Sequence, residues 1–177
     1  ELHDSLDVDS IESILASIST ALDGFVSTYK GTVLSLSAEA LNEAIQQYEQ
    51  IKSSYYQLSQ FAHLNYAVDL QSSDVLKLVS KVDEYGSNMA NQMVFFFLEL
   101  GEASQERLDL WLADDVNQNY QYLITEAVKK NRYRLTEKEE QMINVKDLNG
   151  VDALRKLYGE HTSRYEFKLT IDGKEHV

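Results

Sequence analysis

The sequence of 177 residues contains no cysteine and no proline. Without cysteine there is no disulfide framework and no thiolate metal site. Average usage of about 5% would give roughly nine prolines. Proline breaks helix interiors because it lacks a backbone donor and clashes with the preceding turn. Together with only seven glycines, its absence favours long, uninterrupted helices.

Basic residues and long apolar runs are also scarce. The 16 lysines and arginines stand against 29 acidic residues, which gives a net charge of −13. Binding to a phosphate backbone or to anionic lipid depends on basic residues that displace counterions, so we expect no nucleic acid and no membrane as partners. The longest apolar run, 93–98, is far shorter than the roughly 18 residues that span a bilayer. The acidic N-terminus does not form the basic start of a signal peptide, and we expect a cytoplasmic protein.

Three long segments of the first hundred residues carry an apolar stripe. Their apolar residues recur at steps of three and four, which is the pattern of an amphipathic helix. The segments begin near Ile11, Ser37 and Ser73, and short polar connections between them favour antiparallel neighbours. Asp9–Glu12 has the pattern of a capping box, an acceptor side chain followed three residues later by Glu. Residues 1–100 therefore predict an antiparallel array of three long helices.

Shorter helices are expected in 101–163. Ser104 should cap one of them, 116–128 should form another, and Thr136–Glu139 is a second capping box. The apolar residues of a further helix after the turn at Asn149-Gly150 are Val151, Leu154, Leu157 and Tyr158. The chain as a whole, 1–177, is thus predicted to be mostly α.

Near the C-terminus the apolar residues recur at every second position instead. Between Tyr165 and Ile171 apolar and polar residues alternate, as in a half-buried strand. Asp172-Gly173 is a hairpin-turn dipeptide, and four residues of a return strand follow. Residues 164–177 therefore predict a strand and the start of a β-hairpin that is cut short, and we expect the natural chain to continue.

The sequence offers no catalytic residues and no metal ligands. A catalytic zinc site usually needs three protein ligands, with His and Glu spaced to meet on one face. No His-Glu-x-x-His occurs, and no two histidines stand three or four residues apart. The chain also lacks a Gly-x-Ser-x-Gly elbow and a glycine-rich phosphate loop. We therefore expect no cofactor in this chain and no enzymatic activity of the chain alone.

The apolar run at 93–98 contains three consecutive phenylalanines. Successive helical positions point in different directions, so the three cannot share one buried face. We expect Phe96 in the core and at least one of Phe95 and Phe97 on a surface that faces a missing domain. The alternative is that the shorter helices of this chain cover the whole segment. The candidate interface residues are Phe95, Phe97, Tyr165 and Phe167.

Short motifs along nearly the whole chain resemble one family in the same order. They are Thr28–Gly31, Leu41–Glu49, Ala62–Ala67, Met93–Leu100, Tyr122–Leu123, Leu135–Glu140, Leu148–Gly150, Leu154–Ser163 and Phe167–Gly173. They include the stretch Phe-Phe-x-Leu-Glu at 95–99 and the segment Leu-Thr-Glu-Lys-Glu-Glu at 135–140. In this order they resemble the N-terminal domain of the oligoendopeptidase F family of zinc peptidases, which are relatives of thimet oligopeptidase.

The resemblance implies a parent protein that hydrolyses short peptides inside a channel. Residues 1–177 would be its non-catalytic N-terminal domain and part of the channel wall. The zinc, its ligands and the general base would belong to a catalytic domain of the same polypeptide, which is absent from this sequence. That domain would be the main partner, and short peptides would be the substrates of the parent. The alternative function is a free-standing helical module that binds other proteins.

Overall fold

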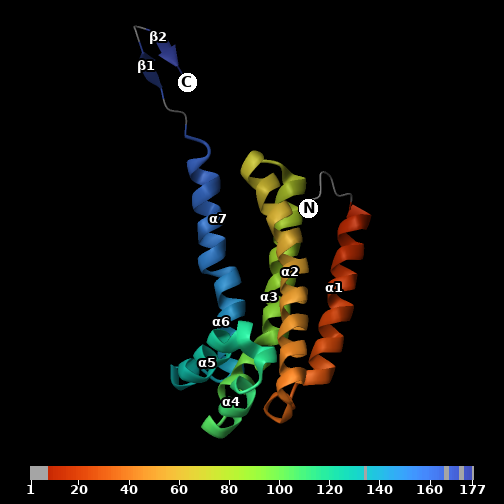
Figure 1. Ribbon diagram of the computed structural model, residues 1–177. Helices are drawn as coiled ribbons and strands as arrows, with labels where there is room; N and C mark the ends of the chain where they lie inside the picture. Colours follow the sequence, from red (N-terminus) through yellow and green to blue (C-terminus); the bar gives the residue numbers. More distant parts are fainter. Residues whose placement is uncertain (1–7, 134, 166–167, 172–173, 177) are drawn as a thin grey trace.

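The computed structural model describes residues 8–133, 135–165, 168–171 and 174–176. Three long helices form its first half: α1 (Val8–Tyr29), α2 (Ala38–Val68) and α3 (Ser73–Gly101). They run down, up and down again side by side (Figure 1), so the predicted antiparallel array is confirmed. Within the described residues no helix has the length and apolar character needed to cross a membrane.

Local sequence signals fix most ends of the long helices. The hydroxyl of Ser37 accepts a hydrogen bond from the backbone of Ala40, and Ser72 caps α3 in the same way. Gly31 adopts a positive φ of 80° after α1, a conformation that costs glycine little. The capping box expected at Asp9–Glu12 is wrong, because α1 already begins at Val8 and Asp9 therefore lies inside the helix.

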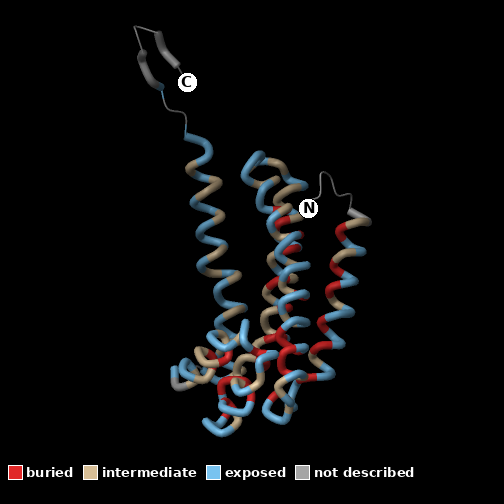
Figure 2. The backbone as a smooth tube through the Cα atoms, in the orientation of Figure 1, coloured by how far each residue is buried: buried red, intermediate tan, exposed pale blue. Residues whose placement is uncertain are grey.

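An aromatic cluster holds the lower ends of the three long helices together. Phe25 of α1 lies 5.3 Å from Phe96 and 5.9 Å from Phe95, between ring centroids, and Tyr48 of α2 stacks on Phe96 at 5.6 Å. The carboxylate of Glu99, on α3, accepts hydrogen bonds from the backbone of the α1–α2 connection. Figure 2 shows the buried residues concentrated in this part of the bundle. The largest fully buried side chains are Trp111, Phe25, Phe95, Phe96, Leu22, Leu41, Ile45 and Leu58.

Short helices close this end of the bundle: α4 (Gln105–Leu112), a 3-10 helix (Asp115–Tyr120), α5 (Gln121–Lys130) and a 3-10 turn (Asn131–Tyr133). Ser104 caps α4 as predicted. The single helix expected over 116–128 is divided in two, and the first part is 3-10.

Two buried hydrogen-bonded side chains explain this division. The amide of Asn117 donates to the carbonyl oxygens of Ala38 and Trp111, and it is fully buried. The side chain of Asn42 donates to the carbonyl of Val116. In these hydrogen bonds a backbone carbonyl and a side-chain amide of the segment pair with groups outside it and not within a regular α-helix. They attach the segment to the start of α2.

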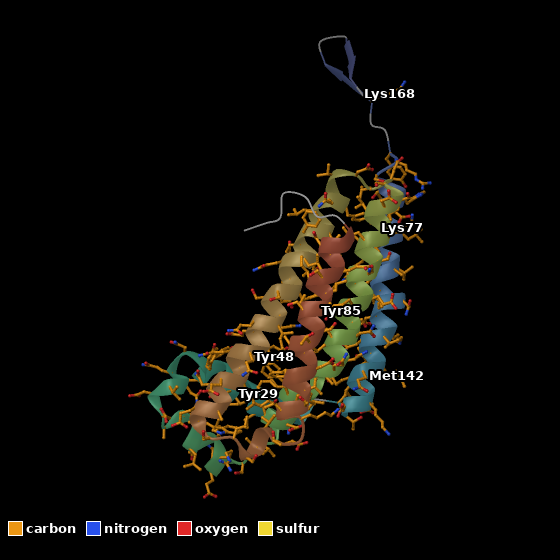
Figure 3. All side chains as sticks on the ribbon, turned by 90° about the vertical axis from the view of Figure 1, so that its right-hand side faces the viewer. Tyr29, Tyr48, Lys77, Tyr85, Met142 and Lys168 are labelled. Carbon is orange, nitrogen blue, oxygen red and sulfur yellow. The ribbon has the colours of Figure 1, made fainter. Side chains whose placement is uncertain are left out.

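The helices α6 (Glu137–Asn149) and α7 (Val151–Thr162) follow one another almost end to end along α3. In Figure 1 they form a rod that rises beside α3 in the opposite direction. Thr136 and Glu139 form the predicted capping box at the start of α6. Two side chains of α6, Gln141 and Asn144, donate hydrogen bonds to Asn91 of α3. Figure 3 shows Met142 of α6 on the far side of α3 from α1.

Two short strands follow α7: β1 (Leu169–Ile171) and β2 (Lys174–His176), paired antiparallel with Leu169 opposite His176. The strand expected from Tyr165 is thus shorter, because Tyr165 still closes the last turn of α7 through a backbone hydrogen bond to Thr162. The turn dipeptide at 172–173 lies outside the described residues, so the complete hairpin stays a prediction.

Candidate interaction surfaces

The three phenylalanines at 95–97 differ in exposure. Phe96 is 0% exposed and Phe95 is 1% exposed. The expectation for Phe96 is confirmed. The interface role expected for Phe95 is not supported, because none of its side chain is left for another domain. The reason is that α1 and α2 cover one face of α3 while α5 packs on another, so the chain buries two sides of this segment by itself.

Phe97 remains available as an interface residue. Its ring is half-buried and meets Tyr48 and Phe96 edge to face, with centroids 5.0 and 5.4 Å apart. It lines a cavity of about 300 Å³ together with Lys52 of α2 and Glu140 of α6. Phe97 therefore has one edge in the core and another on an open surface.

The C-terminal candidates lie apart from Phe97 in the fold. Tyr165 is 53% exposed, and its ring meets that of His161 edge to face at 5.3 Å. Phe167 lies outside the described residues. The structure therefore does not bring Tyr165 and Phe97 into one site.

Exposed apolar side chains gather on α6 and α7, a feature that the periodicity of apolar residues in the sequence did not reveal. Neither helix contributes a buried side chain among the described residues. On α7 the exposed apolar side chains recur at steps of three and four, which places them on one side of the helix. We call them the outer face of α7: Val151, Leu154, Leu157 and Tyr158.

The side of α7 that faces the bundle is polar instead. Asp152 and Lys156 are half-buried there, and the ammonium of Lys156 donates a 2.5 Å hydrogen bond to the carboxylate of Asp83 on α3. The other oxygen of Asp83 lies 3.1 Å from the imidazole of His63 on α2. A helix that packs on a bundle normally turns its apolar side inward. The outer face of α7 is therefore an apolar surface that the described residues leave exposed.

The described residues hold no group of three or more His, Asp or Glu side chains that could bind a metal ion. His63 and His161 lie on different helices, and His3 lies outside the described residues. The fold raises the pKa of several tyrosines of the bundle. Burial raises the pKa of Tyr48, and a hydrogen bond to Glu49 raises the pKa of Tyr120.

One comparison with known proteins matches the part of the chain that contains α6 and α7. Residues 99–167 match the family model for the N-terminal domain of the M3 peptidases, which is described as oligopeptidase F. Among curated proteins no match was found, and none among solved structures. The matched segment runs from the end of α3 through α7 and includes the outer face of α7.

The match confirms the resemblance for this segment. Residues 99–167 are similar to the N-terminal region of oligoendopeptidase F-like M3 metallopeptidases. The similar motifs at 28–31, 41–49 and 62–67 lie outside the matched residues.

Proposed function

We propose that this chain is the non-catalytic N-terminal domain of a zinc metallopeptidase that hydrolyses short peptides. The family match over 99–167 is the observation that carries the proposal. Zinc, its ligands and the general base would belong to a catalytic domain of the same polypeptide. The helical bundle would form part of the wall of the substrate channel, in a cytoplasmic enzyme.

The outer face of α7 is the surface that we assign to the catalytic domain. Its side chains are far from buried: Leu154 is 66% exposed, Leu157 60% and Tyr158 72%. Fully burying one such side chain contributes about 1.5–3 kcal/mol. The face is long enough for several contacts, because its residues cover two turns of the helix. Phe97, Tyr165 and Phe167 stay candidate interface residues, of which Tyr165 follows shortly after α7.

The catalytic domain, produced separately from the same gene, provides the test. Added to this chain, it should bind it, and the complex should cleave a quenched fluorescent peptide in a way that a chelator stops. Leu157→Asp should weaken the complex at least tenfold, because it puts a charge into the apolar contact. Leu64→Asp is the matched control: Leu64 is similarly exposed, at 51%, but lies on α2. It should leave binding unchanged.

A gene that encodes no His-Glu-x-x-His after this segment would contradict the proposal. In that case the alternative, a free-standing helical module, becomes the better reading, and the outer face of α7 would serve an unrelated protein. Binding with normal affinity by Leu157→Asp would leave the peptidase domain assignment intact and refute only the contact surface.

A further inference from the structure

Helix α7 is attached to the bundle much more loosely than α6. The backbone of α6 lies close against α3, whereas α7 does not approach α2 or α3 to the same extent. No residue of α7 is buried. The residues that α7 turns toward the bundle are half-buried and bring no apolar side chain to the contact: Asp152, Lys156 and Gly159. Burial of apolar surface, the main stabilising contribution in most helix contacts, is therefore nearly absent here.

The contact between α7 and the bundle is also incompletely filled. A cavity of about 430 Å³ lies there, with walls that include Tyr55 and His63 of α2, Ser87 of α3 and Asp152 of α7. Helices that pack permanently on one another leave few spaces larger than a water molecule. Side chains that border such a space lose the van der Waals contacts that a partner would supply, so the docked position of α7 is only weakly favoured by packing.

The hydroxyl of Tyr66, on α2, opposes the docked position of α7. It lies close to Gly159 of α7, since a Cβ added at Gly159 would be 4.0 Å from it. The hydroxyl is buried and has no hydrogen-bond partner among the described residues. A buried hydroxyl without a partner is destabilising, because it has given up its hydrogen bonds with water. If α7 moves away, the hydroxyl of Tyr66 regains water.

One charged contact holds α7 in place. Within the described residues, the pair of Lys156 and Asp83 is the only hydrogen bond or ion pair that joins α7 to the three long helices. The second carboxylate oxygen of Asp83 lies 3.1 Å from the imidazole of His63 on α2. Asp83 therefore keeps a polar partner inside the bundle when Lys156 leaves, which lowers the cost of separating the pair.

A single glycine joins α6 to α7. Gly150 is at the same time the C-cap of α6 and the N-cap of α7, with φ −108° and ψ −89°, and no side chain caps α7. A Cβ at this position would lie 2.8 Å from the carbonyl oxygen of Lys146, so glycine permits an approach that a larger residue would disturb. Rotation about the two backbone dihedral angles of Gly150 can turn α7 as a rigid helix while α6 stays on α3.

We propose that α7 is a hinged arm that docks on the bundle through the pair of Lys156 and Asp83 and swings away from it about Gly150. In the docked form α7 closes one side of the cavity. In the open form the cavity and the hydroxyl of Tyr66 reach solvent. The proposal concerns this chain alone, and it does not depend on which protein contacts the outer face of α7.

Pairs of spin labels can measure the position of the arm. The chain has no cysteine of its own, so Ser80→Cys on α3 can be combined with either Ala153→Cys or His161→Cys on α7, all at exposed positions. The two α7 positions lie about 4.5 and 16 Å from Gly150 along the helix. Double electron–electron resonance should resolve a docked and an open distance for the His161 label. The difference between the two distances should be at least twice that for the Ala153 label, which serves as the control near the hinge.

Substitutions in the ion pair test what holds the arm. Asp83→Asn should raise the open population at least threefold, because it removes the charge that pairs with Lys156. Glu84→Gln removes the same charge from the neighbouring exposed position of α3 and should leave the population unchanged. Lys156→Met should act like Asp83→Asn, and the double variant should open the arm no further than the single ones, since both changes break the same pair.

A salt titration of the labelled chain without further substitutions guards against a folding defect in these variants. Raising sodium chloride from about 50 to about 500 mM should increase the open population, because salt screens a pair that is not completely buried. A single distance for the His161 label in both the native background and Asp83→Asn would overturn the proposal. So would an open population that salt does not change, equal distance changes at Ala153 and His161, or equal effects of Asp83→Asn and Glu84→Gln. The domain assignment is tested separately, by binding of the catalytic domain.

Discussion

Removal of single phenylalanine rings should separate the two sides of the 95–97 segment. In Phe96→Ala the lost side chain is fully buried and touches four other rings, those of Phe25, Tyr48, Phe95 and Phe97. An aromatic side chain of this kind buries about 150–250 Å², and at about 25 cal/mol per Å² that corresponds to roughly 4–6 kcal/mol. Measured Phe→Ala changes of about 3–5 kcal/mol agree with this range.

Phe97→Ala should cost clearly less. The ring of Phe97 is only half-buried and keeps one edge on the cavity that it lines with Lys52 and Glu140. About half of the measured Phe→Ala loss of about 3–5 kcal/mol, roughly 1.5–2.5 kcal/mol, is therefore expected. Phe95→Ala should resemble Phe96→Ala, because Phe95 is 1% exposed.

Urea unfolding followed by circular dichroism measures these differences, provided that the slope of the transition stays constant among the variants. We expect Phe95→Ala and Phe96→Ala to lose about 3–5 kcal/mol each and Phe97→Ala about half as much. Equal losses at Phe96 and Phe97 would refute the reasoning, since they would mean that the chain covers all three sides of α3 at this level.

Two further predictions concern α3 and α6. Gly86→Ala should destabilise the fold by about 1–3 kcal/mol in the same urea assay, because the new Cβ would lie 1.9 Å from the hydroxyl of Tyr55, whereas Gly24→Ala, whose Cβ meets nothing within 4 Å, should cost nothing. In the capping box, hydrogen bonds from the backbone and side chain of Thr136 lower the pKa of Glu139 below its ordinary value of 4.5. Stability from a carboxylate with a lowered pKa is present above its unfolded pKa and lost as the pH falls through the folded pKa. Glu139→Gln should therefore be less stable than the native chain at pH 7, and the difference should disappear in acid titrations of the melting temperature as the pH falls through the lowered pKa of Glu139. A pH-independent difference would contradict the assignment.

The local pattern of the sequence determined the helices themselves. Apolar residues that recur every three or four positions predicted α1, α2 and α3. Caps form where the sequence predicted them, at Ser37, Ser104 and Thr136. These features are local, because a capping hydrogen bond joins residues only three positions apart. The same local signal failed at Asp9, where the helix continues toward the N-terminus past a plausible cap.

Tertiary contacts decided which faces of these helices are covered. Periodicity shows that Phe95 and Phe97 point in different directions, but only the packing of other helices on α3, including the contact of Phe25 with Phe95, shows which of the two is buried. In the same way Leu154 and Leu157 form a stripe in the sequence, but only the structure shows that the polar side of α7 faces the bundle, with Lys156 paired to Asp83, and leaves the stripe exposed. The cavities between α2, α3 and the α6–α7 rod are not visible in the sequence at all. Their walls come from α2 and from α6 and α7, which are separated in the sequence by all of α3 and the short helices. No local sequence pattern can therefore predict how far apart these walls lie.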